Sequence, residues 1–357
     1  MNSLHKIICL ILILVFMSGT CACASEPVSG EAHNKELSVK DLILDHLMDS
    51  YEWHITDWGT TSIAIPLPVI VYSQSTGWHV FLSSALHHGA THQGLFIAPE
   101  GKYKGKIVEK DSKGNEARPF DISITKVVMS LLISSILLIF IILTVARSYK
   151  KDVFEAKKGF VGFMEMFIMN INDEVIRPCI GKDYRRFSPY LLTVFFFIFI
   201  NNVLGLIPIF PGGANVTGNI AITFVLALCT FFLVNIVGTK EYWKEIFWPD
   251  VPMWLKFPIP LMPVIEIVGV FTKPFALMIR LFANILAGHS IVLGLTCLVF
   301  VTVKLGAVMN TEMTIVSVVF SVFINFVEIL VAYIQAYVFT MLSAVFIGLA
   351  RVEPHHK

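Results

Sequence analysis

Polar and charged side chains interrupt the longest apolar stretches of this 357-residue chain. Ionisable groups are costly in hydrocarbon, so they usually mark an ion or proton pathway when they occur there. Arginine keeps its proton, whereas histidine and glutamate exchange theirs near neutral pH or when a neighbouring charge shifts their pKa. A permanent cation beside titratable groups therefore predicts proton transfer. The set comprises Glu266, Lys273, Arg280, Asn284, His289, Asn325, Glu328 and Gln335.

Helical spacing places the first five of these residues on two surfaces of one helix. Glu266, Lys273 and Arg280 recur every seven residues and so share a face, unless Pro274 bends the helix strongly. Asn284 lies one turn beyond Arg280 on the same face. His289 lies nine residues beyond Arg280, which is the opposite side, about 13 Å along the axis. The helix thus offers a cation on one side and a titratable imidazole on the other.

The second apolar stretch supplies a carboxylate. Glu328 and Gln335 are seven residues apart, and Asn325 lies close to the same face. Together the two stretches predict a proton path. The alternative is that ion pairs within the membrane only fix the packing of helices, in Glu328–His289 or Glu266–Lys273.

The amino-acid composition indicates the class of protein to which these residues belong. The chain is 55% hydrophobic and 15% charged, with 27 Lys+Arg against 26 Asp+Glu. A soluble domain has about 25% charged residues, so a polytopic membrane protein is indicated. The balanced charge does not indicate a nucleic-acid partner.

The expected fold class is an all-α polytopic membrane protein with a small extracytoplasmic α+β domain at its N-terminus. The membrane domain is expected over 121–350, and residues 351–357 form a cytoplasmic tail. The last two membrane segments exceed the roughly 20 residues of one perpendicular span, so we expect two long, strongly tilted helices. The alternatives are two hairpins, or a part of each segment lying along the membrane. The five membrane helices are expected at about 125–146, 189–209, 217–238, 259–303 and 313–350.

Basic residues set the orientation. Residues 147–188 contain nine Lys and Arg, and the positive-inside rule places this loop in the cytoplasm. An amphipathic segment within it, about 158–176, is expected to lie in the membrane interface. A soluble helix is the alternative there. The N-terminal domain is then outside the cytoplasm.

The N-terminus agrees with that orientation. Residues 1–24 have the basic, apolar and small-residue regions of a signal peptide, and a lipoprotein anchor at Cys21 is the alternative. Residues 25–120 form the expected extracytoplasmic domain, with strands over 62–84 and a helix over 37–47. Its histidines match no standard metal-ligand spacing, so we expect solvated surface residues and assign the domain no chemistry. They are His33, His46, His54, His79, His87, His88 and His92.

Four segments resemble subunit a of the F-type ATP synthase membrane sector. Residues 280–289, RLFANILAGH, resemble the R-L-F-x-N-x-x-A-G segment of that family. Residues 328–339, EILVAYIQAYVF, resemble its last helix, and residues 258–274 resemble the segment before the arginine. Residues 201–208, NNVLGLIP, resemble an earlier N-x-x-G-L-I-P hairpin. The resemblance covers roughly 120–350.

The resemblance implies a stator subunit with two proton half-channels against a rotating ring of c subunits, and no active site of its own. Arg280 matches the arginine that separates the half-channels and displaces the proton from a ring carboxylate. Glu266 matches a position near the cytoplasmic half-channel. The positions that line the other half-channel are matched by Asn284, His289, Glu328 and Gln335.

Some residues depart from the family pattern. His289 and Glu328 exchange the acid and imidazole that some members carry at these two positions. Met278 is bulkier than the small residue usual there, and Asn219 stands where many members have Asp. Lys273, Asn325 and Asn219 are secondary candidates for the proton path.

The implied partners are the c-ring, subunit b of the peripheral stalk, the catalytic head through the complex, and membrane lipid. No cofactor, metal or nucleic acid is expected. The expected location is a bacterial inner membrane, with the N-terminal domain periplasmic and the C-terminus cytoplasmic. The coupling ion, H⁺ or Na⁺, is set on another chain.

Two other classes compete with this interpretation. A free-standing transporter or channel with Arg280 binding an anionic substrate is one, although no internal repeat supports it. A membrane-embedded enzyme is the other, and the chain contains no H-E-x-x-H, G-x-S-x-G or P-loop motif.

Overall fold

The computed structural model describes residues 49–58, 61–73, 76–99, 101–110, 116–149, 158–207, 212–248, 261–303 and 306–351. The expected signal peptide over 1–24, its alternative anchor at Cys21 and the expected helix over 37–47 lie outside these residues. The chain divides into two compact units. The first unit contains Met1–Ile133, Ile207–Ala214 and Ser290–Phe323, and the second contains Ser134–Leu206, Asn215–His289 and Ile324–Lys357.

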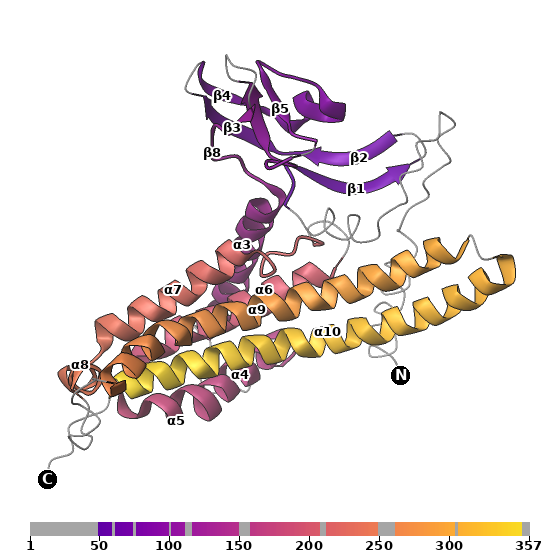
Figure 1. The fold of residues 1–357 in the computed structure, drawn as a ribbon. Coiled ribbons are helices and arrows are strands. Elements are labelled where there is room, and N and C mark those ends of the chain that lie inside the picture. The colour runs from indigo at the N-terminus through magenta and orange to yellow at the C-terminus, as the bar shows by residue number, and fades with distance from the viewer. Residues whose placement is uncertain are drawn as a thin grey trace, which may run out of the picture. The chain divides into compact units, whose positions relative to one another are not determined.

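The first unit contains all the described strands, in three small antiparallel sheets (Figure 1). One is a hairpin of β1 and β2, another has the order β4-β3-β8, and the third has the order β5-β6-β7. The 3-10 helix η1 (Ser83–Gly89) follows β4. The strands are β1 (Glu52–Trp58), β2 (Thr61–Pro66), β3 (Pro68–Ser73), β4 (Gly77–Leu82), β5 (Leu95–Ile97), β6 (Ile107–Lys110), β7 (Glu116–Ala117) and β8 (Phe120–Asp121).

Alternation of side chains gives the central strand two different faces. Val69 and Val71 of β3 are fully buried in a small core, because every second residue of a strand points to the same side. Tyr72, the residue after Val71, faces outward and pairs with Trp78 of β4 on one side and Phe120 of β8 on the other. The strands expected over 62–84 are therefore present.

The sheet region is joined closely to the first membrane helix, α3 (Lys126–Ser148). The backbone N–H of Lys126 donates to the carbonyl of Ser50 at 2.9 Å, and that of Val127 donates to the carboxylate of Asp49 at 3.1 Å. The hydroxyl of Tyr51 donates to Asp121 at 2.5 Å. Burial of Tyr51 raises the pKa of its phenol, and the hydrogen bond to Asp121 adds to the rise.

Two of the seven N-terminal histidines have described side chains. His79 contacts Thr76 and Gln93, and the ring of His92 packs against Phe81. His33 and His46 lie outside the described residues, and the side chains of His54, His87 and His88 are not described. Within the described part of the chain, no three His, Cys, Asp or Glu side chains come together as a metal site.

Five helical segments among the described residues are long and apolar enough to cross a membrane. They are Lys126–Ser148, Phe160–Leu206, Ile220–Val237, Met262–Thr302 and Val308–Ala350. The chain is therefore mostly helical and of the polytopic membrane class, as the composition predicts. The expected count of five is confirmed for this part of the chain.

The second of these segments differs most from its expected limits. It contains α4 (Phe160–Asn170), the π-helix η2 (Ile171–Ile176), α5 (Arg177–Ile180), the 3-10 turn η3 (Gly181–Asp183) and α6 (Tyr184–Leu206). The helix expected to begin at 189 begins five residues earlier, and Pro189 lies within its early turns. The amphipathic helix expected over 158–176 is present as α4 and η2, with Phe163 and Met166 exposed and Ile171 and Val175 buried.

Two shorter helices follow. Asn219 caps α7 (Ile220–Val237), because its side-chain oxygen accepts the N–H of Ala221 at 3.0 Å. Thr239 caps α8 (Lys240–Phe247) by accepting the N–H of Tyr242 at 3.3 Å. The sequence analysis did not predict α8, which is too short and too charged to resemble a membrane span.

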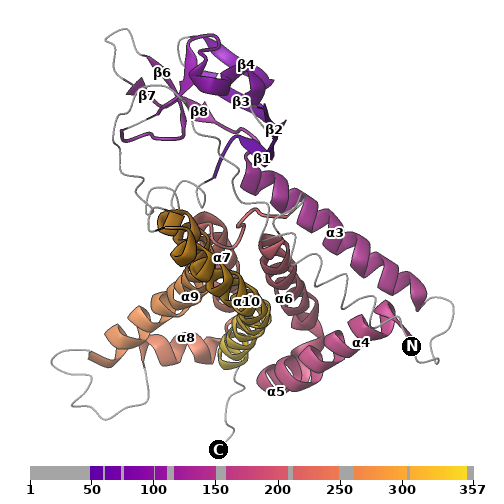
Figure 2. The same ribbon diagram turned by 90° about the vertical axis from the view of Figure 1, so that its right-hand side faces the viewer.

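Aromatic side chains of α6 form the centre of the second unit. Phe195 is fully buried, and the rings of Phe195 and Phe199 contact Tyr333 of α10 at 6.0 and 6.1 Å between centroids. Figure 2 shows α6 between α3 and α10. Small residues of α10, among them Ala336 and Ala344, are fully buried in the same core. They allow the close approach of helices that membrane proteins use for packing.

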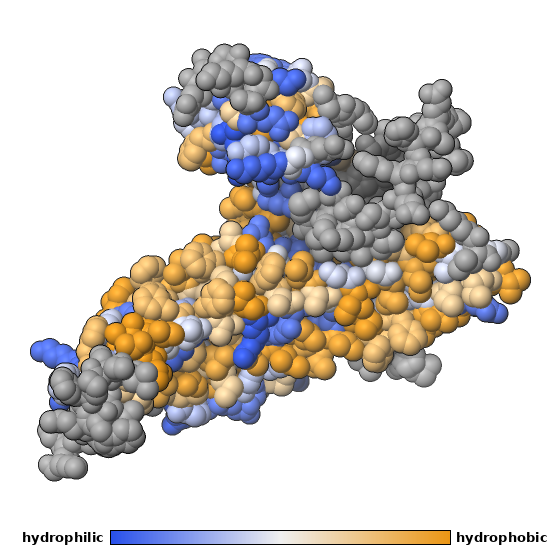
Figure 3. Space-filling model, in the orientation of Figure 1, coloured by the Kyte–Doolittle hydropathy of each residue, from blue (hydrophilic) through white to orange (hydrophobic). Residues whose placement is uncertain are grey.

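The two longest helices, α9 (Leu261–Thr302) and α10 (Ala307–Ala350), are continuous, so the alternative of two hairpins is wrong. They run side by side (Figure 1). Each is about 60 Å long, twice the hydrocarbon thickness of a bilayer. Apolar side chains cover most of their visible surface (Figure 3).

Candidate functional site

Arg280 lies on an outward face of α9. Leu277 and Leu281 are buried at 2% and 1% exposure, whereas Arg280 and Asn284 are exposed. The residues that share the exposed face with them are small, namely Ala276, Ala283 and Ala287. The face thus combines a permanent cation with room for a helix of another chain to approach.

The described residues place no Asp or Glu within ion-pair distance of Arg280. The alternative ion pair Glu266–Lys273 is not formed either, although both residues are described. A buried or lipid-facing cation without a carboxylate is unfavourable. Arg280 is therefore placed to meet a negative charge that this part of the chain does not provide.

Glu328 of α10 comes close to the backbone of α9. A Cβ atom added to Gly288 would overlap the Oε1 atom of Glu328. The carboxyl group thus lies against the residue that precedes His289, and both Glu328 and His289 are partly buried. The structure brings together the two short stretches of helix that carry the predicted acid and imidazole.

The amide residues of α10 differ in their surroundings. Gln335 is 5% exposed, two turns beyond Glu328 on the same helix. Asn325 is partly buried, three residues before Glu328. The three polar side chains therefore form the polar stripe that their spacing predicts.

Lys273 and Glu266 lie on the part of α9 before Arg280. The Nζ atom of Lys273 is 5.7 Å from the centre of the Phe346 ring, a cation–π distance. Burial raises the pKa of Tyr242 of α8, and the negative charge of Glu266 raises it further. Glu266 and Tyr242 are therefore close enough to interact electrostatically.

Asn219 has a structural role that the other candidate residues do not have. Its side-chain oxygen is used as the cap of α7. A neighbouring polar contact joins the hydroxyl of Thr217 to the side-chain oxygen of Asn202 at 2.5 Å, and both residues are buried. Among the described contacts, Asn219 meets none of the other predicted site residues.

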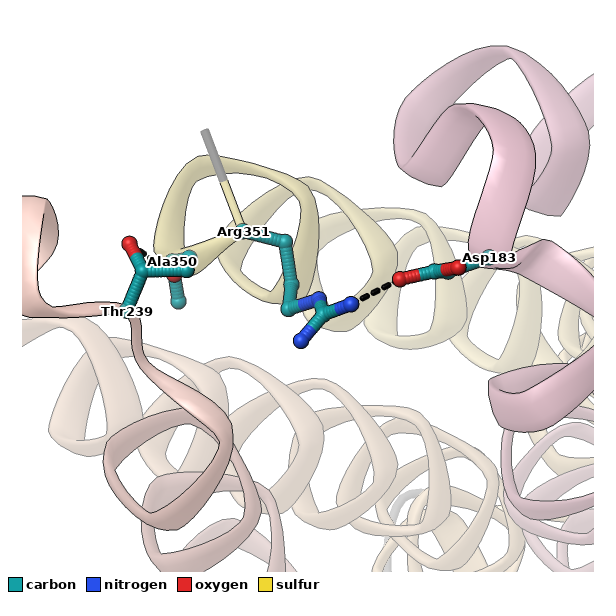
Figure 4. Close-up of polar contacts among 4 residues, drawn as sticks. All are labelled: Asp183, Thr239, Ala350 and Arg351. Carbon is teal, nitrogen blue, oxygen red and sulfur yellow. Dashed lines mark hydrogen bonds and ion pairs between the residues drawn. The ribbon is translucent and has the colours of Figure 1, made fainter. Parts of the chain in front are cut away.

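The end of α10 contacts three other parts of the chain, and Figure 4 shows two of these contacts, those with Thr239 and Asp183. The N–H of Thr239 donates to the carbonyl of Ala350 at 2.9 Å. Arg351 forms an ion pair with Asp183 of η3. A Cβ on Gly348 would overlap the carbonyl oxygen of Cys179 in α5, so this close approach requires glycine.

A small cavity is lined by residues that the sequence analysis did not propose as site residues. Thr230 and Asn235 of α7, Tyr242 of α8, and Lys273 of α9 line it. Only Lys273 was a candidate. A single Asn within the apolar run of α7 is the signal that could have pointed to Asn235, since an uncharged amide in a membrane helix also requires a partner.

Two family models match the chain. The model described as ATP synthase A chain matches residues 127–348, which include every predicted site residue. A model described as a domain of unknown function matches residues 42–122.

Curated relatives point to the same family. The chain is 43% identical over 245 residues to ATP synthase subunit a 2 of Chlorobaculum tepidum, covering 66% of this chain and 65% of the relative. It is 41% identical over 240 residues to the protein of that name from Prosthecochloris aestuarii, covering 67% and 72%. It is 39% identical over 242 residues to ATP synthase subunit a of Myxococcus xanthus, covering 66% and 75%.

The match to the Chlorobaculum tepidum protein spans just under two thirds of that protein's length. The family model itself covers well over half of this chain. The chain therefore belongs to the ATP synthase A chain family.

Proposed function

We propose that this chain is the stator subunit of an F-type ATP synthase and that it couples proton flow through two half-channels to rotation of a c-ring. The observation that carries the proposal is the outward position of Arg280 on α9, without a carboxylate from the described residues. A ring of c subunits would supply that carboxylate. The small residues beside Arg280 leave space for the ring helix.

In this proposal Arg280 acts electrostatically. As the ring carboxylic acid approaches, the guanidinium stabilises the carboxylate form and lowers its pKa, so the proton leaves toward the exit half-channel. The fixed positive charge also opposes direct passage of a proton from one half-channel to the other. Asn284, on the same exposed face, adds a hydrogen-bonding group for the same partner.

The entry half-channel would be lined from both long helices. The carboxyl group of Glu328 lies beside Gly288 and so near His289, and Gln335 continues the polar stripe along α10. Asn325 is a secondary member. Protons would pass along these groups to the ring.

The exit half-channel would lie toward Glu266, with Lys273 as a secondary member. Asn219 is omitted from both channels because its side-chain oxygen caps α7. By the positive-inside rule this end would be cytoplasmic, since the neighbouring helix α8 carries Lys240 and Lys244.

The proposed surroundings follow from the same interpretation. The other partners are subunit b of the peripheral stalk, the catalytic head and membrane lipid. The membrane is a bacterial inner membrane, with the sheet region in the periplasm after removal of the leader and the C-terminus in the cytoplasm. The large apolar side chains exposed on α9 and α10, such as Phe271 and Phe326, suit lipid or ring contacts.

The first test is purification of the tagged chain from its native membrane in mild detergent, with identification of every co-purifying polypeptide. We expect a two-helix proteolipid and nucleotide-binding subunits. A chain that stays alone under conditions that preserve the complex would indicate a free-standing transporter instead.

The second test is Arg280→Ala. We expect normal assembly and complete loss of ATP-driven acidification in inverted vesicles. Lys273, the other cation that the described part of α9 contains, lies beside the Phe346 ring and so cannot replace the guanidinium. Vesicles that still acidify would contradict the stator proposal.

Glu328→Gln and His289→Ala sharpen the entry assignment. Each variant should slow pumping about tenfold without abolishing it, as expected when one proton-transferring group is lost from a path with several. Normal rates in both would show that the entry path lies elsewhere. The control is Ile291→Ala, because Ile291 is an exposed apolar residue of α9, the helix that carries His289.

A further inference from the structure

The sheet β4-β3-β8 presents apolar residues on its outward face. Trp78, Val80 and Phe120 are 60%, 71% and 64% exposed, so the described part of the chain leaves this face largely uncovered. A contiguous group of large exposed apolar side chains marks contact with lipid or with another protein. The exposed members of the face are Tyr72, Trp78, Val80, Leu82, Phe120 and Ile122.

This face is distinct from the core of the sheet region. Side chains alternate along a strand, and Val71 of β3 points inward, where it is fully buried. Within these three strands, His79 and Asp121 are the residues that can carry a charge near neutral pH, and both pair with Val71. Both therefore belong to the inward side, where Asp121 accepts the hydroxyl of Tyr51. The outward side of the three strands has no charged residue.

The outward face lies close to the start of the first membrane helix. Strand β8 leads into α3 through four residues (Figure 1). Ile122 and Ile124, on the same side as Phe120, continue the pairing with β3 through backbone hydrogen bonds. At no more than about 3.5 Å per residue, Phe120 lies within about 21 Å of Lys126, and Ile122 lies within about 14 Å. The face therefore begins near the level at which α3 enters the membrane.

The helix that follows is itself largely uncovered within this chain. Only 17% of its most apolar window is buried, and Val128 and Leu132 in its first two turns are exposed. An apolar helix with so little protein around it contacts lipid. Tryptophan and tyrosine are enriched at membrane–water interfaces, because each has an apolar ring and one polar atom that can reach water. Composition and position therefore favour lipid over a protein as the occupant of the face.

We propose that the outward face of β4-β3-β8 lies on the membrane surface beside the N-terminal end of α3, with its side chains among phospholipid headgroups and the upper part of the acyl chains. The depth is about 5–10 Å, as for other interfacial elements. The sheet region, within the stretch that matches a domain of unknown function, then makes a membrane contact separate from that of the helices. The inference requires only that α3 crosses the membrane and does not depend on the stator proposal.

The test places one fluorescent label on the sheet region of the whole complex, in a background without native cysteines. Val80→Cys carries the label on the outward face, and Glu116→Cys carries it in the control. Glu116 is an exposed residue of β7. The neighbouring strand β6 meets β3 at the end away from α3, where the hydroxyl of Ser73 donates to Glu109. The control label is therefore expected in water.

The labelled complexes are reconstituted in phosphatidylcholine vesicles. Iodide on both sides of the membrane is the quencher in water, and phosphatidylcholine with bromine on the upper part of its acyl chains is the quencher in lipid. We expect iodide to quench the Val80 label several-fold less than the Glu116 label, and brominated lipid to quench it several-fold more. Leu82→Cys, on the same face, is the second position if Val80→Cys does not assemble.

Two results would overturn the proposal. Equal quenching of both labels by iodide would show that the face is open to water. Protection of the Val80 label from iodide and from brominated lipid alike would show that a protein surface covers it, from another subunit or from another part of this chain. Arg280→Ala tests the stator proposal separately, because its pumping does not report where the sheet region lies.

Discussion

Helix α10 meets its neighbours through glycine at two places, and the two places differ in what faces the glycine. In mid-helix, Gly288 of α9 faces the end of the Glu328 side chain. At the C-terminal end, Gly348 of α10 itself faces the backbone carbonyl of Cys179. A side chain can rotate away from an intruding atom, whereas a packed backbone cannot. The mid-helix contact is thus adjustable and the end contact is fixed.

A hydrogen bond and an ion pair beside the end contact add to the difference between the two glycine contacts. The end of α10 is held by Thr239 through the carbonyl of Ala350 and by the Arg351–Asp183 ion pair. The polar residues at mid-helix, Glu328 and His289, are only partly buried. The proposed proton path and the anchoring contacts therefore involve separate parts of α10, so we expect variants to affect transport or stability selectively.

The largest effect on stability is expected from Gly348→Ala. Its Cβ would overlap a backbone atom, and overpacking of this kind costs about 1–3 kcal/mol. We expect earlier loss of the chain from the purified complex on heating. Gly294→Ala is the control, because nothing lies within 4 Å of its added Cβ. Equal heat resistance of the two variants would contradict the fixed character of the end contact.

Gly288→Ala should change transport rather than stability. The added methyl group displaces the carboxyl of Glu328, which can turn aside at little cost, but the displaced acid serves the entry path less well. We expect ATP-driven pumping to fall several-fold, about 1 kcal/mol of barrier, with unchanged heat resistance. Gly269→Ala, with open space at its Cβ, should pump normally. A heat-sensitive Gly288→Ala variant would remove the distinction between the two places.

The smallest effect is expected from Arg351→Gln. The side chains of Arg351 and Asp183 are 30% and 47% exposed, and exposed ion pairs contribute at most about 1 kcal/mol. Heat resistance of the complex should fall slightly at low salt and not at all at high salt, where the pair is screened. A large, salt-independent loss would show that Arg351 holds α10 by packing instead.

The membrane helices could be predicted well from the sequence, because a long apolar run in a bilayer can satisfy its backbone hydrogen bonds only as a helix. The limits of α3 and α9 differ from the expected ones by a few residues. The start of α6 was placed too late, because the expected helix begins at Pro189, after the charged residues, whereas the helix begins at Tyr184 and includes Arg185 and Arg186. Glu312 was likewise taken as a boundary, yet α10 continues through it with the carboxylate exposed.

The site was predictable as a list of residues and not as an arrangement. Spacing along one helix placed Arg280 and Asn284 on a common face, and the structure agrees. The approach of Glu328 to Gly288 depends on the register between two helices, which no pattern within either helix determines. The cavity that Asn235 and Tyr242 line was missed for the same reason, because it forms only where four helices meet around Lys273.

The join between the sheet region and α3 has a mechanical consequence. Only four residues separate β8 from α3, and backbone hydrogen bonds secure this short connection, from Ile124 to Pro68 and from Lys126 to Ser50. The bond from Val127 to the carboxylate of Asp49 ties the first turn of the helix to the residue next to Ser50. Few torsions remain free at such a joint, so it behaves as a rigid bracket rather than a tether. A force applied to the sheets is then transmitted to the first turn of α3 as a torque instead of being absorbed by a slack linker.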